Sequence, residues 1–325
     1  MKDKPRVCIF GAGAIGGYFG VQLSRAGVDV SAVARGPHLA AIREHGLRLR
    51  IDGREHVAAL PCSDRPEHFG TQDYVILTLK AGQISEAVDS MKPLLGPRTT
   101  VVTASNGLPY WFFDFVDSPY RGVTLDGVDP GGRQREALGS DRALGMVVFP
   151  ATEVIAPGVI RHEHGSKLPI GEPGGQRSER AERLHELLNA AGFDAPLRDD
   201  IRDEIWLKLW GNLCFNPISA LTLATIDAIA RDEGTRAVCE TMMAEAKAIG
   251  ERLGLRLRVD ARRRIEGAAA LGAHKMSMLQ DLERRRPMEI EPLVGVVQEL
   301  GRLVSLPTPT IDMVLALIRQ RARSH

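Results

Sequence analysis

The stretch RVCIFGAGAIG at residues 6–16 decides the fold of this 325-residue chain. Residues 6–10 form a short apolar run typical of a buried strand, and three glycines follow at residues 11, 13 and 16. A helical pattern then extends to Gly27, and a second strand pattern covers residues 29–34. A strand, a glycine turn, a helix and another strand within about 30 residues predict a βαβ unit that binds a dinucleotide.

The three glycines have separate roles in such a unit. The first permits a tight turn, the second lets a pyrophosphate approach the backbone, and the third allows close packing of helix and strand. Amide groups at the start of the helix donate hydrogen bonds to the phosphates. We therefore expect all six residues of the motif to contact the cofactor: Gly11, Ala12, Gly13, Ala14, Ile15 and Gly16.

The end of the second strand bears on which dinucleotide binds. The chain reads Val33-Ala34-Arg35-Gly36 there, without the Asp or Glu that holds the ribose hydroxyls of NAD. Arg35 can pair instead with a 2′-phosphate. The sequence therefore favours NADP, and a solvated loop cation is the other interpretation of Arg35.

Two polar residues follow the next predicted strands. Residues 74–79 form the third strand and precede Lys80, and residues 100–103 form the fourth and precede Asn106. Ligands of open parallel sheets collect at the carboxyl ends of strands, so both side chains are candidates for the site. A surface cation at Lys80 and a plain turn at Asn106 are the alternatives.

The remainder of the first half is expected to complete the sheet region. Residues 144–149 predict a strand, residues 158–162 and 167–171 a hairpin, and residues 178–191 a helix. Residues 114–139 are rich in Pro and Gly, and we interpret them as a long excursion outside the core that is either functional or mobile.

The pattern changes near residue 199, where strand patterns disappear and long helical periodicities begin. We expect an α/β domain with a Rossmann-like, doubly wound sheet at residues 1–198 and an all-α domain at residues 199–325. A cleft between two such domains is a favoured place for a reaction site.

A polar row runs through the first helix of the second half. Glu204, Lys208, Asn212 and Asn216 recur at every fourth position in an otherwise apolar segment, so they share one slowly winding face. Burying an amine and two amides is costly unless each finds a partner, and a ligand is one such partner. The alternative is an ordinary ion pair between Glu204 and Lys208, with the asparagines bonded to the backbone. Pro217 predicts a break or a kink just after Asn216.

Composition argues against several classes of function. The formal net charge is +1, so no overall field favours nucleic acid or an acidic membrane. The four cysteines are scattered and no histidine cluster completes a metal site, a pattern typical of reduced thiols in a cytoplasmic protein. No apolar stretch approaches the roughly 18 to 20 residues of a membrane span, and the N-terminus does not read as a signal peptide.

Two further segments of the second half place polar residues near helix starts. Ser277 lies in the stretch KMSMLQD at residues 275–281, and Glu289 lies in MEIE at residues 288–291. Both have purely structural interpretations, because Ser277 can cap a helix and Glu289 can pair with the arginines at 284–286.

Taken in order, the glycine motif, Lys80, Asn106-Gly107, the row around Lys208, the stretch at 277–281 and Glu289 resemble the ketopantoate reductases (2-dehydropantoate 2-reductases). The resemblance spans most of the chain. It implies a Rossmann domain followed by a helical domain like the C-terminal part of 6-phosphogluconate dehydrogenase. It also implies NADPH-dependent reduction of ketopantoate to pantoate, a step of pantothenate and coenzyme A biosynthesis.

The resemblance assigns roles to individual residues. It implies that Lys208, with Glu289, carries the catalytic chemistry and that Lys208 protonates the substrate carbonyl. The residues implied to bind substrate are Asn106, Asn212, Asn216 and Ser277. Beside the glycine motif and Arg35, the residues implied to contact the cofactor are Lys80, Asn106, Ala151 and Glu289.

Two other functions stay open at this stage. The aromatic run at residues 108–113 and the excursion at 114–139 depart from the family pattern, so the substrate could be another 2-oxo or 3-hydroxy acid. A sensor that binds NADP(H) without turnover is the second alternative. Apolar helices at residues 293–303 and 311–318 could pack internally or form the seam of a homodimer.

Overall fold

The computed structural model describes residues 4–324, and its contacts divide the chain into two units. Unit 1 contains the chain up to Ser105 together with Pro109–Val116 and Gly132–Ile201. Unit 2 contains Asn106–Leu108, Asp117–Gly131 and the chain from Arg202 onward. Two short segments from the first half of the sequence therefore belong to the helical unit.

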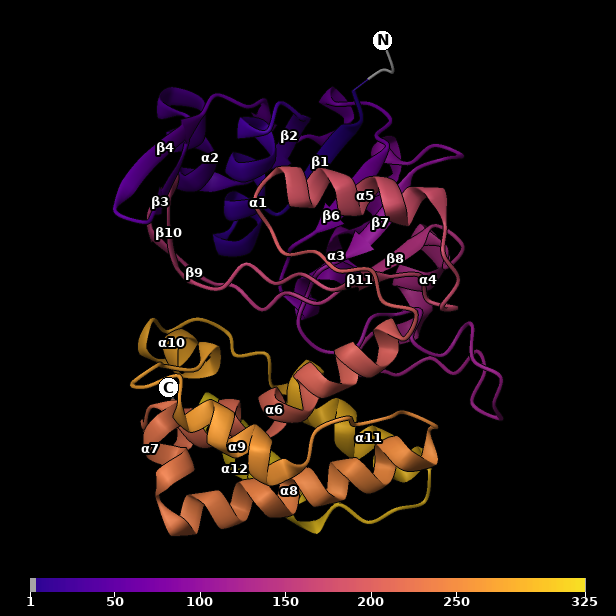
Figure 1. Cartoon of the computed structure of the whole chain (residues 1–325), viewed down its shortest axis with the longest axis vertical. Helices are drawn as coiled ribbons and strands as arrows, with labels where there is room; N and C mark the ends of the chain where they lie inside the picture. The colour runs from indigo at the N-terminus through magenta and orange to yellow at the C-terminus, as the bar shows by residue number, and fades with distance from the viewer. Residues whose placement is uncertain (1–3, 325) are drawn as a thin grey trace. The chain divides into compact units, whose positions relative to one another are not determined.

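Unit 1 is built on a seven-stranded sheet with the strand order β11-β8-β7-β6-β1-β2-β5 (Figure 1). Neighbouring strands are parallel except for β11, which is antiparallel to β8. The central strands β1, β6 and β7 are buried almost throughout, as expected for a sheet with helices on both faces. The strands are β1 (Arg6–Phe10), β2 (Asp29–Val33), β5 (Cys62–Ser63), β6 (Tyr74–Leu77), β7 (Thr100–Thr103), β8 (Ala143–Met146) and β11 (Ile170–Gly171).

A second sheet in unit 1 has four strands in the order β4-β3-β10-β9. They are β3 (Leu47–Ile51), β4 (Arg54–Ala58), β9 (Ala151–Ala156) and β10 (Val159–His164). The predicted hairpin between residues 158–162 and 167–171 is wrong, because β10 pairs with β9 and β3 while β11 joins the other sheet. The turn lies earlier in the chain, where Gly158 adopts a φ of 73° that favours glycine.

The α-helices of unit 1 in the described part of the chain are α1 (Ala14–Arg25), α2 (Gly36–His45), α3 (Ala81–Met91), α4 (Arg133–Leu138) and α5 (Glu179–Ala190). Helix α1 follows the glycine turn and is buried along residues 16–23. Short 3-10 turns lie at Pro66–His68, Lys92–Leu94 and Pro130–Gly132.

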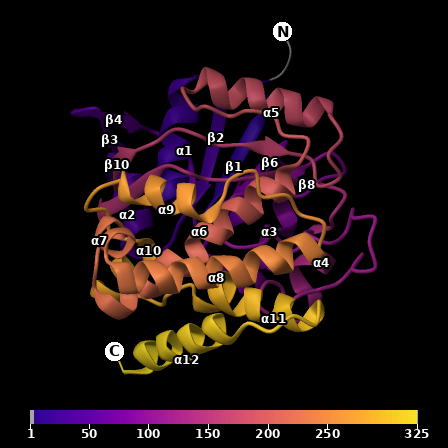
Figure 2. The same ribbon diagram turned by 60° about the horizontal axis from the view of Figure 1, so that its bottom comes forward.

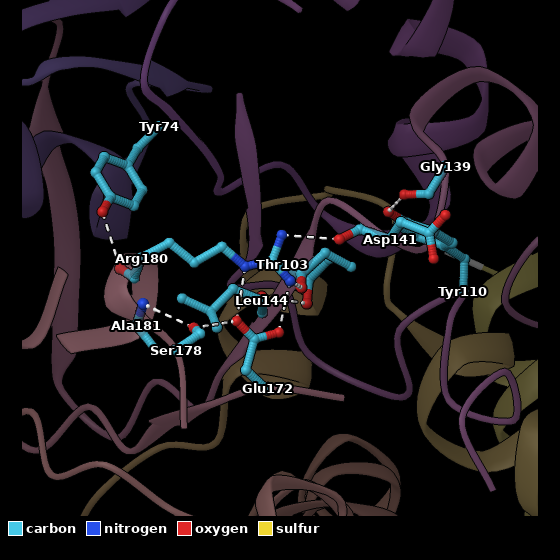
Figure 3. A network of polar contacts seen from close by, with 11 residues as sticks. Tyr74, Thr103, Tyr110, Gly139, Asp141, Leu144, Glu172, Ser178, Arg180 and Ala181 are labelled. Atoms are coloured by element: carbon cyan, nitrogen blue, oxygen red, sulfur yellow. Dashed lines mark hydrogen bonds and ion pairs between the residues drawn. The ribbon is translucent and has the colours of Figure 1, made fainter. Parts of the chain in front are cut away.

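A buried ion pair fastens α5 to the sheet (Figure 3). The Glu172 side chain is only 1% exposed, and it accepts hydrogen bonds from Arg180 Nε at 2.6 Å and Ser178 Oγ at 2.5 Å. Arg180 also donates to the carbonyl of Ala143 in β8 at 3.1 Å, and the Tyr74 hydroxyl donates to the carbonyl of Arg180 at 2.8 Å. Both oxygens of the Glu172 carboxylate therefore accept hydrogen bonds, as the burial of a charge requires.

Unit 2 is helical, and Figure 2 shows its long helix α8 with α12 below it. Its α-helices are α6 (Ile201–Thr222), α7 (Ile226–Arg231), α8 (Glu233–Arg252), α9 (Ala261–Ala269), α10 (Ser277–Glu283), α11 (Val296–Leu303) and α12 (Pro309–Arg323), with a π-helical turn at Glu291–Gly295. In the described part of the chain, no helix has both the length and the apolar character that a membrane span requires.

Helix α6 does not end at Pro217. It continues to Thr222, so the predicted break after Asn216 is wrong. Proline removes one backbone hydrogen bond and crowds the preceding turn. Residues 213–220 are buried without interruption, and their packing outweighs that loss.

The excursion at residues 114–139 is also more integrated than its composition indicates. Leu125, Asp129 and Leu138 are buried, which corrects the interpretation that this segment lies outside the core. The backbone amides of Asp126 and Gly127 donate to the Glu299 carboxylate at 2.8 and 3.0 Å. The middle of the segment, residues 117–131, belongs to unit 2 and is held there by these contacts, whereas its two ends belong to unit 1.

Candidate active site

The glycine turn of unit 1 has the geometry of a phosphate-binding loop. Gly11 adopts a φ of 108°, a conformation open to glycine, and its carbonyl accepts a hydrogen bond from Thr78 Oγ1 at 2.7 Å. A Cβ placed on Gly16 would lie 2.1 Å from the carbonyl oxygen of Gly11, so no larger residue fits there. These contacts fix the turn before any ligand arrives.

The start of α1 leaves room for an anion. A Cβ on Gly13 would meet no atom within 4 Å, so the backbone at this position borders open space. Gly13 is the N-cap of α1 and supplies no side-chain cap, so the first amides of the helix are available to a phosphate. The loop therefore fits a dinucleotide pyrophosphate.

Two residues outside the predicted set, Thr78 and His38, support this loop. Thr78 follows β6 and bonds Gly11. His38 in α2 bonds the carbonyl of Ala12 through Nε2 at 2.7 Å, and its Nδ1 accepts from the amide of Gly158 at 3.0 Å. The position of Thr78 at a strand end could have revealed it, whereas nothing in the sequence around His38 points to this role.

The other cofactor candidates of unit 1 lie at the starts of elements. Arg35 is exposed at the N-cap of α2, directly after β2. Lys80 is half-buried at the N-cap of α3, after β6. Ala151 begins β9 in the four-stranded sheet, where it pairs with His164. Arg35 and Lys80 thus follow parallel strands at their carboxyl ends, while Ala151 belongs to the second sheet.

Three residues that are distant in sequence meet in unit 2. Lys208 Nζ in α6 donates a hydrogen bond to Asn106 Oδ1 at 2.9 Å. Asn106 Nδ2 in turn donates to Glu289 Oε2 at 3.0 Å. The charges on either side fix the orientation of this amide, because a flipped amide would set its NH2 group against the ammonium and its oxygen against the carboxylate. Asn106 therefore connects the cation to the anion.

The environment of Lys208 makes it a better proton donor than an exposed lysine. Burial lowers its pKa from 10.5 to about 8, Glu289 opposes this shift, and the positive charge of Arg264 adds to it. At neutral pH the amine is still mostly protonated, yet it gives up its proton far more readily than a solvated lysine. This balance suits a general acid.

The polar row continues along α6 with two different kinds of asparagine. Asn216 is buried, and its Oδ1 accepts from Ser277 Oγ at 3.0 Å and from the amide of Met278 at 3.1 Å. Both lone pairs are thus used to cap α10, so a ligand can meet Asn216 only at Nδ2. Asn212 is half-buried, and within residues 4–324 its side chain makes no hydrogen bond. Asn212 is therefore ready for a ligand.

The aromatic run belongs to the packing of unit 1. Tyr110, Trp111, Phe112 and Phe113 are each at most 4% exposed. Trp111 Nε1 donates to Thr103 Oγ1 at 3.1 Å. Side chains so deeply buried do not present a surface to a ligand, so the run gives no reason to expect an altered pocket.

A glycine loop that fits a dinucleotide and a half-buried lysine of lowered pKa define a class, the nicotinamide-dependent oxidoreductases that reduce a carbonyl group. Comparison with known proteins is more specific. Residues 7–109 match the family model described as ketopantoate reductase PanE/ApbA, and residues 200–322 match the model of its C-terminal part. The chain belongs to the ketopantoate reductase family.

Individual relatives agree over nearly the whole length. The chain is 57% identical over 318 residues to a 2-dehydropantoate 2-reductase of Mesorhizobium japonicum, covering 98% of both chains. A ketopantoate reductase-type structure from Ralstonia solanacearum superposes with a TM-score of 0.95 at 42% identity, covering 99% of both chains. A family member from Ralstonia eutropha gives 0.84 at 28% identity, covering 98% of this chain and 99% of the other.

Proposed function

We propose that the protein reduces ketopantoate to pantoate with NADPH, a step of pantothenate and coenzyme A biosynthesis. The observation that carries this proposal is the arrangement of Lys208, Asn106 and Glu289, with the pKa of the lysine lowered to about 8. A relative named 2-dehydropantoate 2-reductase, which is 57% identical over nearly the whole chain, supports the proposal.

The side chains around Lys208 account for the chemistry. A nicotinamide cofactor, when bound, would supply the hydride. As the hydride reaches the carbonyl carbon, negative charge develops on the carbonyl oxygen, and the Lys208 ammonium stabilises this charge and then transfers a proton to it. Glu289 keeps Lys208 protonated before the reaction, and Asn106 holds the ammonium in place. Asn212 and Asn216 Nδ2 are donors for the other oxygens of the substrate, whereas Ser277 Oγ, which donates its proton to Asn216, is left as an acceptor.

Preference for NADPH is assigned to Arg35. It is an exposed guanidinium at the end of β2 and at the start of α2, and residues 33–37 contain no carboxylate to hold a ribose diol. Arg35→Ala should weaken NADPH binding by about tenfold or more while leaving NADH binding nearly unchanged. Equal losses for the two cofactors, measured by fluorescence titration, would reject this assignment.

The role of Lys208 can be tested directly. Lys208→Ala should lower kcat for ketopantoate by about 10² to 10⁴. Lys247→Ala on α8 is a matched control, because its side chain is 55% exposed and its partner is the surface residue Glu251. Turnover that is equal in the Lys208 variant and the wild type would exclude the proposed proton donor.

A panel of 2-oxo acids decides the substrate. Ketopantoate should give the highest kcat/KM, and a larger value for another acid would move the assignment to that acid. NADPH binding without turnover on the whole panel would instead indicate a sensor. A cytoplasmic location and a homodimer stay predictions.

A further inference from the structure

A guanidinium near Lys208 has no hydrogen-bond or ion-pair partner among residues 4–324. Arg264 lies in α9, and among the described residues its buried Nε makes no hydrogen bond. A Cβ placed on Gly211 would lie 2.6 Å from one terminal nitrogen of Arg264 and 3.0 Å from its Nε. The guanidinium therefore rests against α6 in space that the absence of a side chain at Gly211 provides.

A guanidinium that is largely removed from water and has no counter-charge is energetically unfavourable. Burial lowers the pKa of Arg264, and of the residues that the structure describes Cys214 alone opposes this shift. Arginine stays charged at any physiological pH, so it cannot escape the cost of burial by losing its proton. Buried charges are normally paired with an opposite charge. An anion from outside the chain would supply the missing counter-charge.

The position of Arg264 beside α6 indicates which kind of anion it binds. Gly211 lies three residues after Lys208 and one residue before Asn212, so Arg264 meets the helix within about one turn of the lysine, a rise of about 4.5 Å. The positive charge of Arg264 also lowers the pKa of Lys208, so the two cations lie close enough to repel each other. A small anion held by Arg264 consequently lies beside the group that protonates the carbonyl.

We propose that Arg264 binds the carboxylate of the 2-oxo acid that Lys208 protonates, an inference that rests on the proposed function. In a 2-oxo acid the carboxylate is bonded directly to the carbonyl carbon, so two cations one helical turn apart match its two neighbouring groups. The planar guanidinium can donate two parallel hydrogen bonds to a carboxylate, which fixes the plane of the acid as well as its position. Arg264 then determines that the substrate is an acid and not a neutral ketone.

The decisive variant is Arg264→Met, which keeps the stem of the side chain and removes the charge. The KM for ketopantoate should rise by roughly 30- to 1000-fold, the loss expected when a buried charge pair is broken. The KM for NADPH should change by less than about twofold. The preference of the wild type for the acid over its methyl ester should shrink by a similar factor, because the ester carries no charge for the arginine to recognise.

Stability separates this role from a structural one. Removing a buried charge that has no partner should leave the melting temperature of the ligand-free protein unchanged or higher. Arg262→Met is the matched control on the same helix, since its side chain is 87% exposed and pairs only with Glu266 at the surface. This control should preserve both KM values.

A second variant displaces the guanidinium without removing it. Gly211→Ala adds a methyl group where Arg264 now rests, and the flexible arginine must move away. This variant should also raise the KM for ketopantoate and not that for NADPH.

The outcomes separate the two proposals. An unchanged KM for ketopantoate in Arg264→Met, with an active wild type, overturns the inference and leaves the proposed function standing. A rise in the KM for NADPH alone also overturns it, because the anion would then be a phosphate of the cofactor. If the wild type reduces a different 2-oxo acid and Arg264→Met loses affinity for it, the inference stands and the ketopantoate assignment falls. A wild type inactive on every 2-oxo acid overturns both.

Discussion

Changing Glu289 to Gln should move the pH range in which the enzyme works. Glu289 is the carboxylate that raises the pKa of Lys208, which stands at about 8 against the strong lowering effect of burial. A carboxylate at short range typically shifts a neighbouring group by about one pKa unit or more. The amide keeps the shape of the side chain but not its charge, so the pKa of Lys208 should fall to about 7 in the variant.

The size of the effect follows from the protonated fraction. Reduction needs the ammonium, so the rate falls as pH rises through the pKa of Lys208. At pH 8 about half of the wild-type molecules carry the proton, compared with about a tenth of the variant, a roughly fivefold difference in rate. At pH 6 nearly all molecules of both proteins are protonated, and this part of the difference disappears.

Initial rates of NADPH oxidation between pH 5.5 and about 9.5, with saturating ketopantoate, measure both profiles. Glu291→Gln is the control, because this carboxylate lies two residues further on and forms a paired contact with Arg319 at the surface. The reasoning fails if the falling limb of Glu289→Gln stays at the wild-type pH or moves to higher pH. It also fails if the rate drops by the same factor at every pH, since Glu289 would then act only through position.

Further predictions concern the cofactor loop and the buried ion pair. Gly16→Ala should lower the melting temperature and weaken NADPH binding by about 10² or more, because its Cβ would lie 2.1 Å from a backbone oxygen. Gly13→Ala should keep the wild-type melting temperature, since its Cβ meets nothing within 4 Å, yet also lose NADPH; tight binding by calorimetry would contradict the phosphate role. Arg180→Met should lower the free energy of unfolding by about 3 to 5 kcal/mol, because Glu172 stays buried without its partner. The double variant with Glu172→Leu should regain most of that loss in urea titrations, and no recovery would argue against the ion pair as the cause.

The parts of the fold that the sequence predicted are those encoded locally. The glycine motif requires a strand before it and a helix after it, and residues 6–25 form both. The cap of α5 is also local, since Ser178 accepts from the amide of Ala181 three residues on. The row from Lys208 to Asn216 follows from helical periodicity alone.

The parts that could not be predicted depend on long-range packing. Pro217 signals a helix end, but the burial of residues 213–220 outweighs this local preference. Strand β10 pairs with β9 on one side and with β3 on the other. Because β3 lies far away in the sequence, no local turn signal reveals this second pairing. Arg264 is one of several arginines in α9, and its buried Nε and its position against Gly211 distinguish it from the solvated ones.

The segment Asn106–Leu108 has a consequence for protein engineering. It lies far ahead of α6 in the sequence but belongs to the helical unit, where Asn106 accepts the hydrogen bond of Lys208. A chimaera joined at residue 198 would therefore combine the lysine of one parent with the asparagine loop of the other. Recombination between family members should transfer residues 106–108 together with the helical part, so that Lys208 and the asparagine that accepts its hydrogen bond come from the same parent.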